Sequence, residues 1–245
     1  MAVFNRKRVT LISTVLAVTA CTVADSESVL TSGMSAYIDV IARGNGTTEV
    51  VAALAAGDTL NSARIELQGD DRLMASNGEQ IRQLSKRHTG FLSYGTSLNG
   101  DSVNRRYTVD FERTVDSSTH SWTYLPEPFD ITHPASDVLI EDEGVDLEWE
   151  VTHGGQLRLK VSMECSNYAN QKSFRSSVTN ISDDGHQYLD LDGLMSAFNQ
   201  PYFFDVCDVT ATLQSHQSGQ LDTRFGKGGS IEGIQSRSRH FKFEP

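Results

Sequence analysis

Apolar and polar residues alternate along most of the chain, which predicts β-strands with one buried face. The pattern is clearest in RRYTVDFER around Tyr107 and in DLEWEV around Trp149. These runs are short and are separated by turn sequences such as GNGTT, QGDD and LNGDS. Residues 49–56 (EVVAALAA) are also expected to form a strand, because eight residues are short for an isolated helix. The pattern predicts an all-β protein of antiparallel sandwiches.

The alternation falls into two series, separated by Pro126 and Pro128. Two prolines within three residues stiffen the chain and interrupt strand pairing, so the domain boundary is expected there. The expected modules are residues 35–125 and residues 126–245. In the second module, apolar positions recur every second residue in 145–151, 157–165 and 207–213.

The first twenty residues have the three-part layout of a secretory signal peptide. A basic head (Arg6, Lys7 and Arg8) precedes an apolar run from Val9 to Val18 and small residues before Cys21. A run of about ten residues is too short to remain as a transmembrane helix, which needs about twenty. We therefore expect residues 1–20 to be removed on export.

Residues 18–21 (VTAC) resemble the lipobox of bacterial lipoproteins. The resemblance implies that Cys21 is acylated and becomes the first residue of the mature chain, which is then anchored to a membrane. Thr22 stands where Gram-negative inner-membrane lipoproteins commonly have Asp, so the resemblance points to the outer membrane. The alternative is an ordinary signal peptide, with Cys21 following by chance. Residues 21–34 are small and polar and are expected to form a flexible tether.

Most of the mature chain resembles bacterial envelope lipoproteins built from immunoglobulin-like β-sandwich modules. The residues that carry the resemblance are Cys21, the strand with Trp149, and Tyr107, which follows a Gly-Asp turn as in a tyrosine corner. Trp149 precedes both remaining cysteines, whereas in antibody domains a Trp lies between them. The resemblance therefore implies the sandwich architecture and not the antibody disulfide.

If Cys21 is acylated, Cys165 and Cys207 are the two thiols that remain in an exported chain. Export leads to an oxidising compartment, so the two are expected to form a disulfide between neighbouring or facing strands. The alternative is a pair of buried free thiols. Two cysteines do not supply a zinc site, and no cofactor or metal is expected.

The formal net charge of −11 argues against a nucleic-acid partner, because such binding depends on clustered Lys and Arg. The charge is uneven. Residues 34–125 contain 9 basic and 11 acidic residues, whereas residues 126–245 contain 9 basic and 19 acidic residues. Residues 137–150 hold seven acids and no Lys or Arg.

Asp146, Glu148 and Glu150 share one strand face and are the candidate acidic binding face. They would either pair with Arg158 and Lys160 or with Arg237 and Arg239, or bind a cationic partner. A straight strand does not wrap Ca²⁺ as its six to eight oxygen ligands require. The sequences at 183–185 (DDG) and 190–193 (DLDG) are typical of turns.

The sequence contains none of the local motifs of serine hydrolases, zinc proteases or nucleotide-binding loops. The leading hypothesis is a membrane-anchored envelope lipoprotein with a non-catalytic role in binding, adhesion or envelope structure. Two alternatives are an envelope hydrolase with a site assembled from distant residues, and a carrier of a lipid or other apolar ligand.

Overall fold

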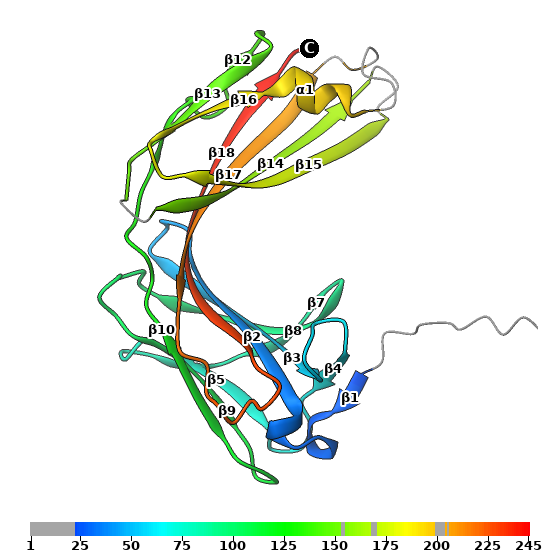
Figure 1. Cartoon of the computed structure of the whole chain (residues 1–245), viewed down its shortest axis with the longest axis vertical. Coiled ribbons are helices and arrows are strands. Elements are labelled where there is room, and N and C mark those ends of the chain that lie inside the picture. Colours follow the sequence, from blue (N-terminus) through cyan, green and yellow to red (C-terminus); the bar gives the residue numbers. More distant parts are fainter. Residues whose placement is uncertain (1–22, 153–154, 168–170, 199–203, 205) are drawn as a thin grey trace, which may run out of the picture.

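The computed structural model describes residues 23–152, 155–167, 171–198, 204 and 206–245. Strands account for 59% of the structure and helices for 6%, which confirms the all-β class with sandwich-like packing of sheets. Figure 1 shows two groups of strands, one above the other.

The lower group in Figure 1 contains the strands of the first half of the chain. They are β1 (Val23–Asp25), β2 (Met34–Ala42), β3 (Thr47–Ala56), β4 (Ala63–Glu66), β5 (Arg72–Ser76), β6 (Ile81–Gln83), β7 (Ser85–Thr89), β8 (Phe91–Asn99), β9 (Tyr107–Glu112) and β10 (Thr119–Thr123). The expected strand at 49–56 lies within β3 and is confirmed.

The upper group contains the strands of the second half and one short helix. The strands are β11 (Ile131–His133), β12 (Leu139–Ile140), β13 (Gly144–Trp149), β14 (Gln156–Ser166), β15 (Lys172–Ser182), β16 (His186–Asp190), β17 (Val206–Ser218) and β18 (Gly229–Phe243). The helix is α1 (Leu191–Ser196).

One large sheet runs through both groups, with the strand order β1-β4-β3-β2-β18-β17-β14-β15. In the lower group it packs against a four-stranded sheet, β10-β9-β5-β6, and in the upper group against a three-stranded sheet, β11-β13-β16. Most pairs are antiparallel, but β1 with β4, β18 with β2 and β12 with β18 are parallel. The two sandwiches therefore share a sheet.

The hydrophobic residues form two clusters that divide the chain close to the expected boundary. The first is drawn mainly from residues 34–125 and the second from residues 129–243. However, Phe225 and Ile231 pack in the first cluster, which differs from the expected assignment of all of residues 126–245 to one module. Ile231 lies near the start of β18, whereas Phe241 and Phe243 near its end lie in the second cluster.

Tyr107 at the start of β9 forms the bonds expected of a tyrosine corner. Its side chain is fully buried. The hydroxyl accepts a hydrogen bond from Thr48 Oγ1 at 3.3 Å and lies 3.4 Å from the carbonyl oxygen of Gly100, seven residues upstream. This contact joins the turn before β9 to strand β3 of the facing sheet.

Residues 23–34 are folded onto the first sandwich, so the expected flexible tether is wrong for the residues that the structure describes. β1 pairs with β4, and two single-turn 3-10 helices follow, η1 (Ser26–Ser28) and η2 (Thr31–Gly33). Ser26 and Thr31 are fully buried. The small polar composition that suggested a linker instead reflects close packing against the body.

The buried guanidinium of Arg113, at the end of β9, holds this segment in place. It donates hydrogen bonds to the carbonyl oxygens of Ser26 at 2.6 Å and Val29 at 3.0 Å, and to Thr31 Oγ1 at 2.9 Å. Its charge is balanced by Asp71, whose Oδ2 lies 3.1 Å from Nε. A charge removed from water is tolerated only when its donors are satisfied in this way.

Asp116 adds a second connection between the segment and the body. Its Oδ2 accepts a hydrogen bond from the backbone N–H of Thr31 at 2.5 Å. The hydrogen bonds from Thr31 and from the backbone N–H of Ser117 favour the ionised form and lower the pKa of the Asp116 carboxyl.

We expect Arg113→Met to lower the free energy of unfolding by about 3 kcal/mol, because it leaves Asp71 buried without its cation. Backbone amides of residues 26–31 should then exchange faster with deuterium. Arg72→Met is the matched control, because Arg72 pairs with Glu112 on the surface of the same sandwich and should cost less than about 1 kcal/mol. Equal losses in the two variants would contradict the anchoring role of Arg113.

Candidate binding surface on the second module

The candidate acidic residues lie on the solvent side of the three-stranded sheet. Along β13 the side chains alternate, so that Val145 and Leu147 are buried while Asp146 and Glu148 are exposed. Glu150 directly follows the strand and is also exposed. Strands β11, β13 and β16 carry no Lys or Arg. The acidic residues of the face lie on β13 and at the end of β16.

Among the described residues, none of the four basic residues expected to neutralise this face pairs with Asp146, Glu148 or Glu150, so that interpretation is wrong. Arg239 does reach the edge of this sheet, where its guanidinium donates a hydrogen bond to the carbonyl oxygen of Ile131 on β11. Arg158 and Lys160 are on β14, and Arg237 and Arg239 are on β18, both strands of the large sheet. Alternation along one strand does not indicate which strand will lie beside it.

The ion pairs that do form near the face are few. Asp146 Oδ1 lies 2.9 Å from Nε2 of His186 on the neighbouring β16, and both side chains are more than half exposed. Arg237 pairs at 3.1 Å with Asp130, which precedes β11.

The pKa of Tyr188 on β16 reflects the negative charge around it. Partial loss of hydration raises the pKa of its hydroxyl, and the charges of Glu143, Asp190 and Asp146 raise that pKa further. Its ring lies across Gly144 on the adjacent strand, where an added Cβ would be only 2.5 Å from the hydroxyl oxygen. Glycine at this position leaves room for the ring and for the carbonyl oxygen of Leu189.

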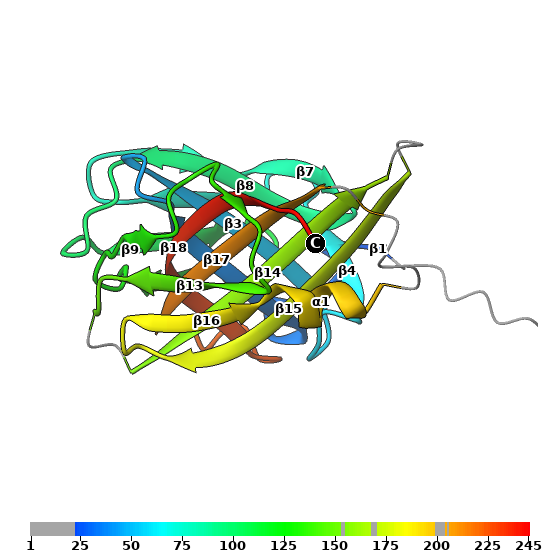
Figure 2. The ribbon, with the colours of Figure 1, turned by 90° about the horizontal axis from the view of Figure 1, so that it is seen from above.

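A groove of about 680 Å³ adjoins the acidic face, between the edges of the two upper sheets. β15 and β14 form one wall, and β16 and α1 form the other. Figure 2 shows β15, β16 and α1 along this side of the molecule. The residues that line it are six apolar side chains, Leu159, Val161, Ile181, Leu189, Leu191 and Leu194, and polar ones that include Ser177, Thr179, Asp184, Tyr188 and Asp190.

The two Asp-rich turns have structural roles at the ends of strands. Asp183 accepts hydrogen bonds from Trp149 Nε1 at 2.9 Å and from the hydroxyl of Thr152 at 2.7 Å, which connects the turn to the end of β13. Asp190 caps α1 and accepts from the backbone N–H of Gly193 at 2.7 Å. Within the described residues, no group of three His, Cys, Asp or Glu is placed to hold a metal ion.

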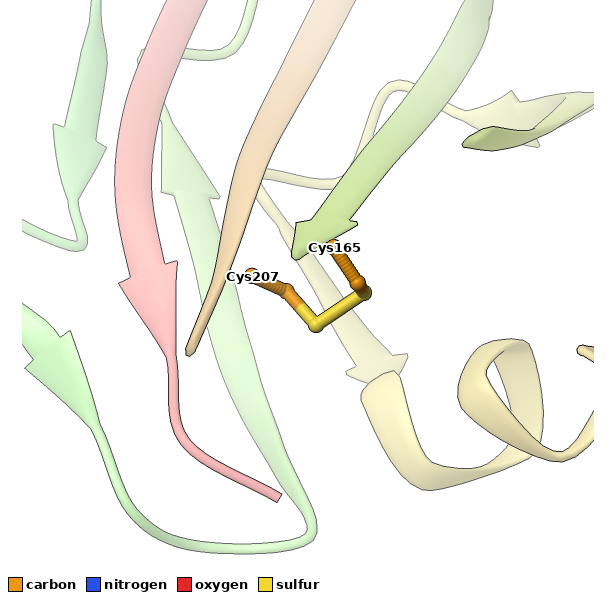
Figure 3. Close-up of a disulfide and its surroundings, with 2 residues drawn as sticks. All are labelled: Cys165 and Cys207. Atoms are coloured by element: carbon orange, nitrogen blue, oxygen red, sulfur yellow. A yellow bond between two sulfur atoms is a disulfide. The ribbon is translucent and has the colours of Figure 1, made fainter. Parts of the chain in front are cut away.

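Cys165 and Cys207 form a disulfide, as expected, with their Cα atoms 4.0 Å apart. They lie directly opposite each other on β14 and β17, two neighbouring strands of one sheet (Figure 3). Both are fully buried in the second cluster. The bond therefore joins adjacent strands and not the two facing sheets.

A polar cluster on the large sheet was not expected, because its members come from separate strands. His216 on β17 lies 2.9 Å from Glu232 on β18, and Glu232 is aligned with Asp39 on β2. Loss of hydration, together with the charge of Glu232, raises the pKa of the Asp39 carboxyl. His216 and Glu232 line a second groove, of about 650 Å³, with Arg158.

Cys21 and the signal segment lie outside the described residues. No helix in the described part of the chain is long and apolar enough to span a membrane.

No protein-family model and no curated protein matches this chain. Among solved structures, the calcium-binding domain CBD12 of CALX1.1 matches with 9% identity over 85% of this chain and 99% of that one, at a TM-score of 0.19. CBD12 from CALX1.2 matches with 9% identity over 84% of this chain and 100% of that one, at a TM-score of 0.20. Scores this low support no inference about this chain.

Removing the disulfide should destabilise the protein by about 4 kcal/mol in the chain-entropy model, because the cysteines are 42 residues apart. The measurement is urea unfolding of Cys165→Ala/Cys207→Ala. Wild-type protein kept in reductant is the control and should lose a similar amount. Unfolding free energies that are unchanged in both would show that the bond does not stabilise the fold.

Proposed function

We propose that the protein is a lipid-anchored, non-catalytic binding protein of the bacterial envelope, which engages a cationic partner through the second module. The observation that carries the binding part is the exposed face of β11, β13 and β16, which has several carboxylates and no Lys or Arg. An unbalanced face of this kind attracts cationic partners and orients them before contact.

The anchoring part rests on the sequence around Cys21, which resembles a lipobox. Removal of residues 1–20 would leave 18 basic and 32 acidic residues, a net charge of −14. Two or more acyl chains on Cys21 would hold the protein on a bilayer stably. The Gram-negative outer membrane is the proposed location, because Thr22 follows the cysteine.

The folded N-terminal segment changes the geometry of such an anchor. A free tether of twelve residues could hold the body about 40 Å from the bilayer. Because β1 starts at Val23, two residues after Cys21, the chain between them spans less than about 8 Å. The first sandwich would then lie against the membrane surface.

Cys21→Ser should move the protein from the membrane to the soluble fraction and abolish its labelling with palmitate, because no acyl chain can be attached. Cys165→Ala/Cys207→Ala is the control and should remain in the membrane fraction. A Cys21→Ser protein that still sediments with membranes would disprove the lipid anchor.

The triple variant Asp146→Asn/Glu148→Gln/Glu150→Gln removes three negative charges from the face. It should bind a flexible Lys-Gly-Ser repeat peptide about tenfold more weakly at low salt, because each exposed charge contributes about 0.5 kcal/mol to the binding free energy. Fluorescence anisotropy of the labelled peptide measures the change.

The control for this test neutralises three exposed acids of the first sandwich region, Asp25→Asn/Asp58→Asn/Asp70→Asn. Binding should change less than twofold in this variant. If both triple variants bind the peptide equally, the acidic face is not a distinct binding surface.

A further inference from the structure

The outer edge of β15 is an unusually regular strand edge. All eleven residues of β15 pair one to one with β14, without a bulge. β15 is the last strand of the large sheet, and β14 is its only neighbour among the described strands. Every second residue of an edge strand therefore presents its backbone N–H and C=O groups outward.

The half of β15 from Ser177 to Ser182 carries none of the residues that commonly protect a strand edge. Natural edges are commonly blocked by Lys, Pro, a bulge or a covering segment. The sequence of this half, SVTNIS, contains no charged residue and no proline. The other half carries Lys172 and Arg175, and the Arg175 guanidinium lies over the buried ring of Phe198.

Two polar residues on the core-facing side of the same half are exposed, whereas Ile181 on that side is partly buried. Ser177 and Thr179 are aligned with Val161 and Leu159 on β14, which are buried in the second cluster. Ser177 and Thr179 themselves are exposed. The three-stranded sheet ends at β16, so it leaves the groove open above them.

We propose that an extended cationic segment of another protein binds here as an additional strand on β15, with part of its side chains in the groove. Strand addition uses the free backbone groups of an edge for affinity and the pockets beside it for specificity. This proposal rests on the proposed function and names the chemistry of its partner.

Charge complementarity identifies the occupant. Asp184 and Asp190 line the groove, and the acidic face lies next to it. Lys or Arg side chains of the added strand can lay their aliphatic stems over Leu159 and Leu189 and place their charges near these carboxylates. A second copy of this chain would instead bring together two modules of 9 basic and 19 acidic residues each.

The apolar side chains on the opposite face of β15 favour an alternating partner. Phe174 and Val178 point away from the core and are 60% and 52% exposed. A segment that alternates basic and β-branched residues would place its apolar side chains beside Val178 and its basic ones in the groove.

The test uses the whole soluble mature chain and a peptide of about ten alternating Lys and Val residues. The peptide should bind, binding should weaken with salt, and the amides of residues 177–182 should become protected from deuterium exchange. The same peptide with alternate backbone nitrogens methylated should bind at least about tenfold more weakly, since it cannot complete the ladder. A Glu-Val peptide should not bind.

Ser177→Lys and Ser176→Lys are a matched pair of variants on one strand. The side chain of residue 177 faces the groove and that of residue 176 faces the other side of the sheet. Ser177→Lys should weaken binding about tenfold through repulsion and steric block, and Ser176→Lys less than about twofold.

Three results would overturn strand addition. Binding of the Lys-Val peptide that neither protects residues 177–182 nor responds to methylation would reject it while leaving the acidic face as a binding surface. Absence of binding by any cationic peptide would reject both proposals. A wild-type dimer that Ser177→Lys dissociates would assign the edge to a second copy of the chain.

Discussion

The architecture depends on one strand that takes part in two hydrophobic cores. β18 is fifteen residues long, about 50 Å when extended, and passes from the first cluster at Ile231 to the second at Phe241. At Gly233 it passes so close to the backbone of Tyr124 that an added Cβ would lie 1.9 Å from its carbonyl oxygen. The two sandwiches are therefore joined by sheet hydrogen bonds and close backbone packing, in addition to the Pro126–Pro128 connection.

The shared sheet also explains where the molecule is open. In the upper half, the large sheet extends to β15, but the sheet that covers it contains three strands and ends at β16. At this edge of the large sheet, the core-facing residues Ser177 and Thr179 of β15 are polar, so they tolerate exposure. The groove therefore results from the different widths of the two sheets. The acidic residues beside it favour a positively charged ligand.

The two ends of the molecule have different proposed roles. The N-terminal segment is bound to the first sandwich by Arg113, at the end of the molecule opposite α1 and β16 (Figure 1). In the proposed anchoring, the first sandwich lies at the membrane and the acidic face points away from it. Rigid coupling through β18 would hold that orientation, because residues 23–34 are folded onto the first sandwich.

The sequence alone indicated the all-β class, several strands with their buried faces, and the disulfide partners, because a period of two and a pair of cysteines are local or countable properties. It did not indicate β15 or β18. Burial of Leu147 and exposure of Asp146 followed from alternation. Only the tertiary structure decided which strands are neighbours. It placed Arg237 in a different sheet from Glu148, folded residues 23–34 onto Arg113, and gave β15 a single neighbour among the described strands. These outcomes depend on contacts between residues far apart in the chain, which no local pattern encodes.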